Sequence, residues 1–150
     1  IIFSKKPSSV FEVGFGYCNN LISVSRILQQ CSIHGCDISK KQWTGALKLY
    51  GKEMYDFNLY IGDFIDIKLT EKYDFVYSNA VLMHMSTNRQ KLAIAKMCDI
   101  SNKYVMLLDG KLQIPKLEEF ISPFGKVTYF DKWANKHWTE NYAVPILIEK

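Results

Sequence analysis

The stretch that decides the fold is FEVGFGYC, residues 11–18, in which an apolar segment runs directly into two closely spaced glycines. The residues SVFEV at 9–13 predict a buried strand, and a helical pattern follows at about 20–30. Between them, Gly14 and Gly16 allow the backbone to approach a ligand closely. Two glycines in a loop also occur for purely structural reasons, so the pattern alone does not establish a ligand site.

The residues around the glycines indicate what kind of ligand would fit. A dinucleotide-binding loop has a third glycine at the position that Asn19 occupies here. Glu12 ends the apolar strand, and a buried carboxylate is costly unless a cation or a hydrogen-bond donor meets it. An ammonium or sulfonium group would meet that need, whereas a pyrophosphate would be repelled. The loop therefore favours a cationic ligand over a nicotinamide dinucleotide.

Strand-like and helix-like segments alternate along the whole chain. This alternation predicts an α/β fold with a mainly parallel sheet, in which the residues that follow each strand meet at one edge. Further strands are expected at 32–38, 58–62, 73–78, 103–108, 126–130 and 142–149, the last weakened by Pro145. Helices are expected from Ser39, with SKKQ at 39–42 as a capping box, from Thr87 or Asn88 to about residue 100, and from Pro115.

Carboxylates stand at the ends of the second and third expected strands. Asp37 lies 23 residues after Gly14, where a carboxylate can accept both hydroxyls of a ribose. Asp63 and Phe64 offer an acceptor and an aromatic face for an adenine, with Ile38 as the opposite wall. Read separately, Asp63 could merely cap a turn and Ile38 could be core. The case rests on all of these residues falling at successive strand ends.

Four segments of the chain resemble the motifs of the S-adenosylmethionine (SAM)-dependent methyltransferases with the Rossmann-like fold. They are FEVGFG at 11–16, GCDIS at 35–39, GDF at 62–64 and YDFVYSNAVLMH at 73–84, and the resemblance runs from Val10 to about Lys150. The last segment is similar to the small-molecule branch. The resemblance implies a three-layer sandwich whose seven-stranded, mainly parallel sheet has an antiparallel last strand.

The resemblance also implies a role for each matching residue. Residues at successive strand ends would hold successive parts of SAM: Glu12, Gly14 and Gly16 the methionine end, Asp37 the ribose, Asp63 and Phe64 the adenine, and Asn79 the floor. Cys18 replaces a small residue and is expected to narrow the space beside SAM. We expect residues 1–150 to be one methyltransferase domain that lacks the helices usually found before the first strand, so either the chain is cut or its site is open.

Methyl transfer from a sulfonium is a direct displacement, so a base is needed only for an acceptor that loses a proton. His84, near the cofactor edge, is the candidate catalytic base, although it could instead be a structural histidine. Tyr77 is a weaker candidate, and His137 and Trp138 could line a substrate pocket or lie in a surface loop. Metal-dependent relatives have carboxylates after the fourth strand and an Asp-Asn pair after the fifth. This chain has SN at 78–79 and DG at 109–110 instead, so no metal is predicted.

The expected acceptor is a hydroxyl or amine of a small molecule, such as a sugar or a natural-product intermediate. An RNA or protein methyltransferase would share every cofactor residue, and an inactive cofactor-binding partner subunit is a further alternative. Nucleic acid is disfavoured, since the net charge of +4 comes from scattered lysines with only two arginines, Arg26 and Arg89. No membrane segment or secretory signal is visible, and the four cysteines form no paired motif, so a cytoplasmic protein with reduced thiols is expected.

Overall fold

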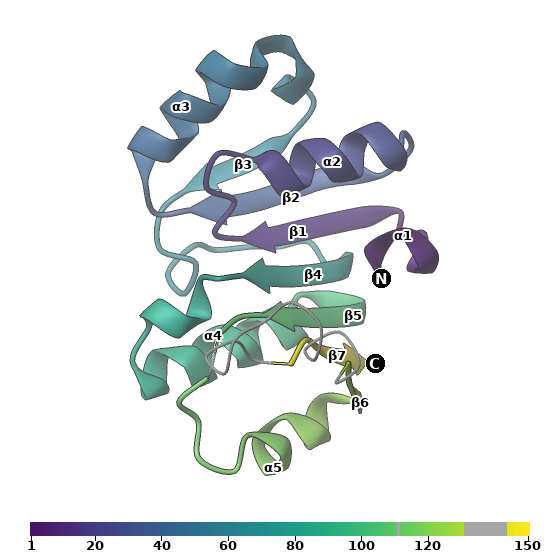
Figure 1. Ribbon diagram of the computed structural model, residues 1–150, viewed down its shortest axis with the longest axis vertical. Coiled ribbons are helices and arrows are strands. Elements are labelled where there is room, and N and C mark those ends of the chain that lie inside the picture. The colour runs from purple at the N-terminus through teal and green to yellow at the C-terminus, as the bar shows by residue number, and fades with distance from the viewer. Residues whose placement is uncertain (111, 131–143) are drawn as a thin grey trace.

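Seven strands form one sheet in the order β3-β2-β1-β4-β5-β7-β6 (Figure 1). The computed structural model describes residues 1–110, 112–130 and 144–150. Strand β7 runs antiparallel to both of its neighbours, β5 and β6, while β1 to β5 pair in parallel. This confirms the expected fold class. The strands are β1 (Ser9–Val13), β2 (Ser32–Asp37), β3 (Asn58–Ile61), β4 (Tyr73–Asn79), β5 (Ser101–Leu108), β6 (Lys126–Tyr129) and β7 (Ile146–Glu149).

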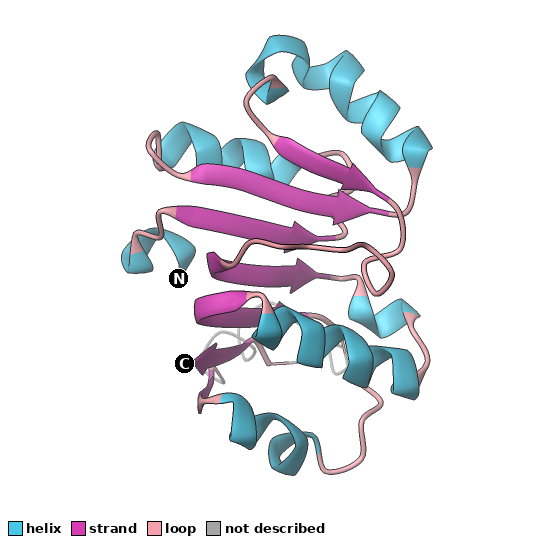
Figure 2. Ribbon diagram, turned by 180° about the vertical axis from the view of Figure 1, so that it is seen from behind, coloured by secondary structure: helices cyan, strands magenta, loops and turns pink. Residues whose placement is uncertain are grey.

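Helices cover both faces of the sheet and make it the middle of three layers. Helices α1 and α2 lie on one face and α4 on the other, as the two opposite views show (Figures 1 and 2). Within the described part of the chain, no helix has the length and apolarity needed to span a bilayer. The helices are α1 (Ile2–Lys5), α2 (Asn19–Ile27), α3 (Lys40–Tyr50), α4 (Thr87–Asp99) and α5 (Leu117–Ile121), with 3₁₀ turns η1 (Gly51–Met54), η2 (Leu82–His84) and η3 (Ser122–Phe124).

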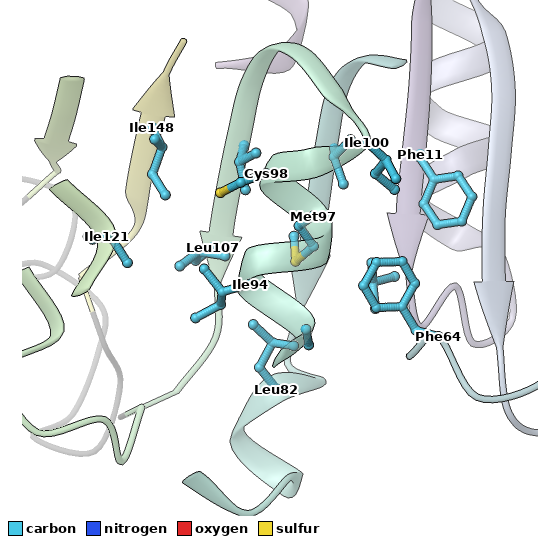
Figure 3. Close-up of a cluster of buried hydrophobic side chains, with 14 of the residues drawn as sticks. Phe11, Phe64, Leu82, Ile94, Met97, Cys98, Ile100, Leu107, Ile121 and Ile148 are labelled. Atoms are coloured by element: carbon cyan, nitrogen blue, oxygen red, sulfur yellow. The ribbon is translucent and has the colours of Figure 1, made fainter. Parts of the chain in front are cut away.

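Two hydrophobic cores form, one on each face of the sheet, because successive side chains of a strand point to opposite faces. In β1, Val10 joins the core under α2 and α3, while Phe11 joins the core under α4 and α5. Figure 3 shows the second core, where Ile94 and Met97 of α4 point into the sheet. Both side chains are fully buried, and each such burial contributes about 1.5–3 kcal/mol. The packing fixes α4 on the sheet and with it the loop that precedes α4.

Helix α3 is capped by Ser39 as predicted, but the capping contacts at α3 and α4 differ in part from those expected. At α3, the Ser39 hydroxyl accepts the Gln42 amide as expected, but the Ser39 amide donates to Asp37 Oδ1 at 2.7 Å. The second half of the predicted capping box is therefore replaced by Asp37. At α4, the N-terminal flanking residue is Ser86, and the Thr87 hydroxyl donates to the Gln113 carbonyl oxygen instead of capping the helix.

The C-terminal third departs from expectation near its prolines. Helix α5 begins at Leu117, two residues after Pro115, so this proline lies outside the helix. Strand β7 begins directly after Pro145, whose carbonyl oxygen accepts the amide of Phe130 at 3.0 Å. A proline without an N–H is tolerated at that place, and no bulge is needed. Residues 142 and 143 of the expected last strand lie outside the described residues.

Candidate functional site

A cavity of about 710 Å³ opens at the edge of the sheet where β1, β2, β3 and β4 end. Every strand end that the sequence singled out contributes to it, because parallel strands place their carboxyl ends together. Eight predicted site residues line the cavity: Gly14, Gly16, Asp37, Ile38, Asp63, Phe64, Asn79 and His84. Glu12 is the exception, and lies buried below the glycine loop.

The glycine loop leaves no space for a side chain at Gly14, whereas at Gly16 the end of the flexible Gln42 side chain would have to move. A Cβ on Gly14 would overlap the side chain of Val81, whose farther methyl carbon would lie 3.0 Å away. A Cβ on Gly16 would lie 2.9 Å from Gln42 Oε1. Both glycines have positive φ, which other residues rarely adopt. Cys18 is fully buried and is not among the lining residues, so the expected narrowing of the cavity by this side chain is wrong.

Asp37 is held in place by two backbone amides. Its Oδ2 accepts from Gly16 at 2.8 Å, and its Oδ1 accepts from Ser39 at 2.7 Å. A carboxylate oxygen has more than one acceptor position, so both oxygens retain room for a further hydroxyl donor. The carboxylate thus ties the glycine loop to the end of β2 and lines the cavity with a fixed orientation.

Asp63 has a partner that the sequence did not reveal. Its Oδ1 accepts from the Ile65 amide at 3.0 Å, and its Oδ2 accepts from Arg89 of α4, which also lines the cavity. Arg89 lies 26 residues away in the sequence and belongs to no recognised motif, so nothing in the sequence indicated that it pairs with Asp63. An adenine amino group that donates to Asp63 would have to share this carboxylate with the guanidinium.

The two proposed walls of the adenine site differ in exposure. Phe64 is 4% exposed and belongs mainly to the core, with its ring centroid 6.0 Å from that of Phe11. Lys96 Nζ lies 5.0 Å from the same ring. Ile38 is 73% exposed, which excludes the alternative interpretation that it is a core residue. The aromatic side of the cavity is therefore rigid, and the aliphatic side is open to solvent.

Glu12 is a buried carboxylate with one oxygen unsatisfied. Its Oε1 accepts from Asn20 Nδ2 at 2.7 Å, while its Oε2 has no hydrogen-bond partner among the described residues. Burial raises the pKa of Glu12 to about 7, and the hydrogen bond from Asn20 opposes the rise. Tyr77, its register partner on β4, is also buried with an unsatisfied hydroxyl. The Tyr77 hydroxyl can donate to Glu12, which also opposes the rise in the pKa of Glu12, and Glu12 itself does not line the cavity.

A second cavity of about 330 Å³ shares one lining residue, Asn79, with the first. Its walls are mostly apolar and come from the ends of β4 and β5, together with α1 and α2. Tyr77 lines it as well, but burial and the nearby Glu12 raise the pKa of Tyr77 well above its usual value, so this hydroxyl is a poor base. Residues that line the second cavity include Ile2, Asn20, Ser23, Met106 and Leu108.

His84 lies at the mouth of the first cavity. It ends the turn η2, is exposed, and has its backbone amide bonded to the Val81 carbonyl oxygen at 3.1 Å. The imidazole can therefore exchange protons with solvent and with a molecule in the cavity. His137 and Trp138, the other substrate-pocket candidates, lie outside the described residues.

Comparison with known proteins agrees with this geometry. Residues 10–103 match the family model described as a methyltransferase domain, whereas no curated protein matches the chain in sequence. A SAM-bound magnesium protoporphyrin IX methyltransferase from Synechocystis PCC 6803 superposes with a TM-score of 0.72 at 16% identity, over 94% of this chain and 69% of that chain.

Two further solved structures share the fold. A SAM-bound amino pentose methyltransferase of calicheamicin biosynthesis from Micromonospora echinaspora gives a TM-score of 0.74 at 10% identity, over 98% of this chain and 85% of that one. PKMT2 from Rickettsia typhi, in complex with AdoHcy, gives 0.63 at 18% identity, over 72% of this chain and only 22% of that one. The family match, which spans more than half of the chain, and the strand order together show that this chain belongs to the class I SAM-dependent methyltransferases.

Proposed function

We propose that residues 1–150 form one methyltransferase domain that transfers the methyl group of SAM to a hydroxyl or amine of a small molecule, such as a sugar or a natural-product intermediate. The observation that carries the proposal is one cavity lined by residues from four strand ends, with Asp37 at the end of β2 and Asn79 at the end of β4. The named neighbours include enzymes for a porphyrin and an amino pentose, which supports a small acceptor.

The residues present fit the chemistry of SAM. Gly14 and Gly16 line the cavity with bare backbone, and a Cβ on them would meet Val81 and Gln42, which also line it. The buried carboxyl of Glu12, whose pKa is raised to about 7, would be stabilised in its charged form by a cationic methionine end. Asp37 would accept the ribose hydroxyls, and Asp63 would accept from the adenine amino group.

The second cavity is the natural place for the acceptor. It adjoins the first at Asn79, and its apolar walls suit a ring or an aliphatic body rather than a charged polymer. A volume of about 330 Å³ is at the lower end of the range for small-molecule sites. In this arrangement the strand ends fix the cofactor and the cavity beside Asn79 fixes the nucleophile.

SAM supplies an activated methyl group on a positively charged sulfur, so the protein has little covalent chemistry of its own to perform. Its residues would hold donor and acceptor in line. For a hydroxyl acceptor, His84 would accept the proton through an imidazole nitrogen and pass it to solvent, since its side chain is exposed. An amine acceptor that is already neutral needs no base before transfer.

Thermal unfolding with S-adenosylhomocysteine tests the cofactor site. At about 100 times its Kd, a ligand that binds only the folded state adds about 2.7 kcal/mol, or roughly 5–10 °C in Tm for a chain of this length. An unchanged Tm at saturating ligand would refute the cofactor assignment. Turnover is then followed with methyl-labelled SAM and a panel of amino sugars and phenols. Methyl transfer to an RNA or a protein, with none to the panel, would refute the small-molecule assignment.

A further inference from the structure

The turn that follows β4 is anchored by a buried carboxylate on the neighbouring strand. Asp109, directly after β5, is 4% exposed and does not line the cavity. It accepts the backbone amides of Val81 and Leu82, each at 2.6 Å, and the hydroxyl of Ser78. Hydrogen bonds to a carboxylate are shorter and stronger than neutral ones, so this side chain holds three donors of one turn at once.

A second buried side chain holds the carbonyl groups of the same turn. Gln90 of α4 is fully buried, and its Nε2 donates to the carbonyl oxygens of Leu82 at 3.1 Å and Met85 at 3.2 Å. Its Oε1 accepts the amide of Gln113 at 2.9 Å, which orients the amide group. Asp109 and Gln90 therefore satisfy opposite polarities of the backbone in one short segment, with Leu82 bonded to both.

The turn needs this support because it contains a strained residue. Ala80 has a φ of 56°, in the left-handed region that residues other than glycine adopt at an energetic cost. The next residue, Val81, packs so closely against Gly14 that a Cβ added to Gly14 would overlap the Val81 side chain. The amide of Ala80 also donates to the carbonyl oxygen of Leu108 at 3.1 Å. Without these bonds, the chain at Ala80 would be free to relax and to draw Val81 away from the glycine loop.

We infer that Asp109 and Gln90 are positioning residues of the methyltransferase. They hold the strained turn at Ala80 so that Asn79 lines the junction of the two cavities and His84 lines the mouth of the first. The anchor itself follows from the hydrogen bonds, whereas its effect on ligand affinity rests on the proposed cofactor site. Asp109 acts through the backbone of the turn and touches neither cavity.

Asp74 offers a matched control. It is 6% exposed and accepts the amide and hydroxyl of Ser8, at 3.0 and 2.7 Å, together with Lys103 Nζ at 2.9 Å. It is thus a second buried carboxylate with three donors, but it lies at the start of β4, at the opposite edge of the sheet from the cavity. Asp74→Ala and Asp109→Ala should both lower Tm.

The two alanine variants should differ in hydrogen exchange at the turn and in ligand affinity. Only Asp109→Ala should speed hydrogen exchange at the Val81 and Leu82 amides, and it should weaken S-adenosylhomocysteine binding about tenfold. Asp109→Asn should largely restore the slow exchange and the ligand affinity. Its side-chain oxygen can accept the two backbone amides while its NH₂ donates to Ser78 Oγ. This variant also serves where the alanine form does not fold.

Several results would overturn the inference. Wild-type exchange at Val81 and Leu82 in Asp109→Ala would show that the carboxylate does not anchor the turn. Equal loss of ligand affinity in Asp74→Ala would show that only general stability matters. A wild-type chain that binds no S-adenosylhomocysteine would refute the proposed function instead, and the exchange rates would still decide whether Asp109 anchors the turn.

Discussion

Replacing Gly14 with alanine should damage both the stability and the cofactor site of this chain, in a way that a matched glycine does not. Gly14 has a φ of 75°, and an added Cβ would overlap Val81. Gly51 has a φ of 48°, but an added Cβ would meet nothing within 4 Å. Both substitutions place an alanine at a positive φ, and only Gly14→Ala adds a steric clash.

The magnitudes follow from these two terms. A backbone conformation with positive φ costs a residue other than glycine about 1–3 kcal/mol, which is the whole expected loss for Gly51→Ala. Overpacking against Val81 adds about 1–3 kcal/mol, so Gly14→Ala should lose roughly 2–6 kcal/mol in the free energy of unfolding. At about 2–4 °C per kcal/mol for a chain of this length, the two variants should differ in Tm by roughly 2–12 °C.

Urea unfolding of four chains tests the source of the loss: wild type, Gly14→Ala, Val81→Ala and the double variant. Because Val81→Ala removes the methyl groups that the new Cβ would meet, the double variant should recover about 1–3 kcal/mol relative to additivity. Titration with S-adenosylhomocysteine should show weaker binding for Gly14→Ala and unchanged binding for Gly51→Ala. Equal stability losses at the two glycines, with no coupling to Val81, would refute the reasoning.

Three further predictions concern the charged groups of the site. The free energy of unfolding should fall as pH rises from about 4.5 to about 7, because folded Glu12 keeps a proton that the unfolded chain releases. In urea titrations across this pH range, the fall should be smaller by roughly 3 kcal/mol in Glu12→Gln than in the wild type. An identical dependence of the unfolding free energy on pH in the two chains would exclude Glu12 as the cause. Asp37→Ala should remove most of the Tm increase that S-adenosylhomocysteine produces, since it deletes the ribose acceptor and the anchor of Gly16; a full increase would exclude this role. His84→Ala should lower kcat about 100-fold or more for a hydroxyl acceptor while calorimetry finds unchanged S-adenosylhomocysteine affinity, and wild-type kcat would remove His84 from the mechanism.

Helix starts show how local signals compete with contacts that form only in the fold. Ser39 was identifiable as a cap because its hydroxyl and the Gln42 amide are three residues apart. Thr87 looked equally suitable, but in the fold its hydroxyl donates to the carbonyl oxygen of Gln113. A capping preference is worth about 1 kcal/mol, so a distant acceptor of similar strength can redirect the side chain.

The sequence by itself determined the α/β fold class of this protein, with its mainly parallel sheet, and the edge of the sheet at which the predicted site residues gather. Apolar periodicity distinguishes strands from helices, and the handedness of their connections places Gly14, Asp37, Asp63 and Asn79 at one edge. These properties depend on neighbours along the chain, so they can be read from it.

Only the tertiary structure decided the chemistry of those residues. The pairing of Asp63 with Arg89 and the raised pKa of Glu12 depend on side chains that converge from separate elements. The bond from Ser78 to Asp109 joins residues 31 positions apart. Such contacts follow no periodic spacing and cannot be predicted from the local sequence, because they arise from the packing of strands and helices against each other.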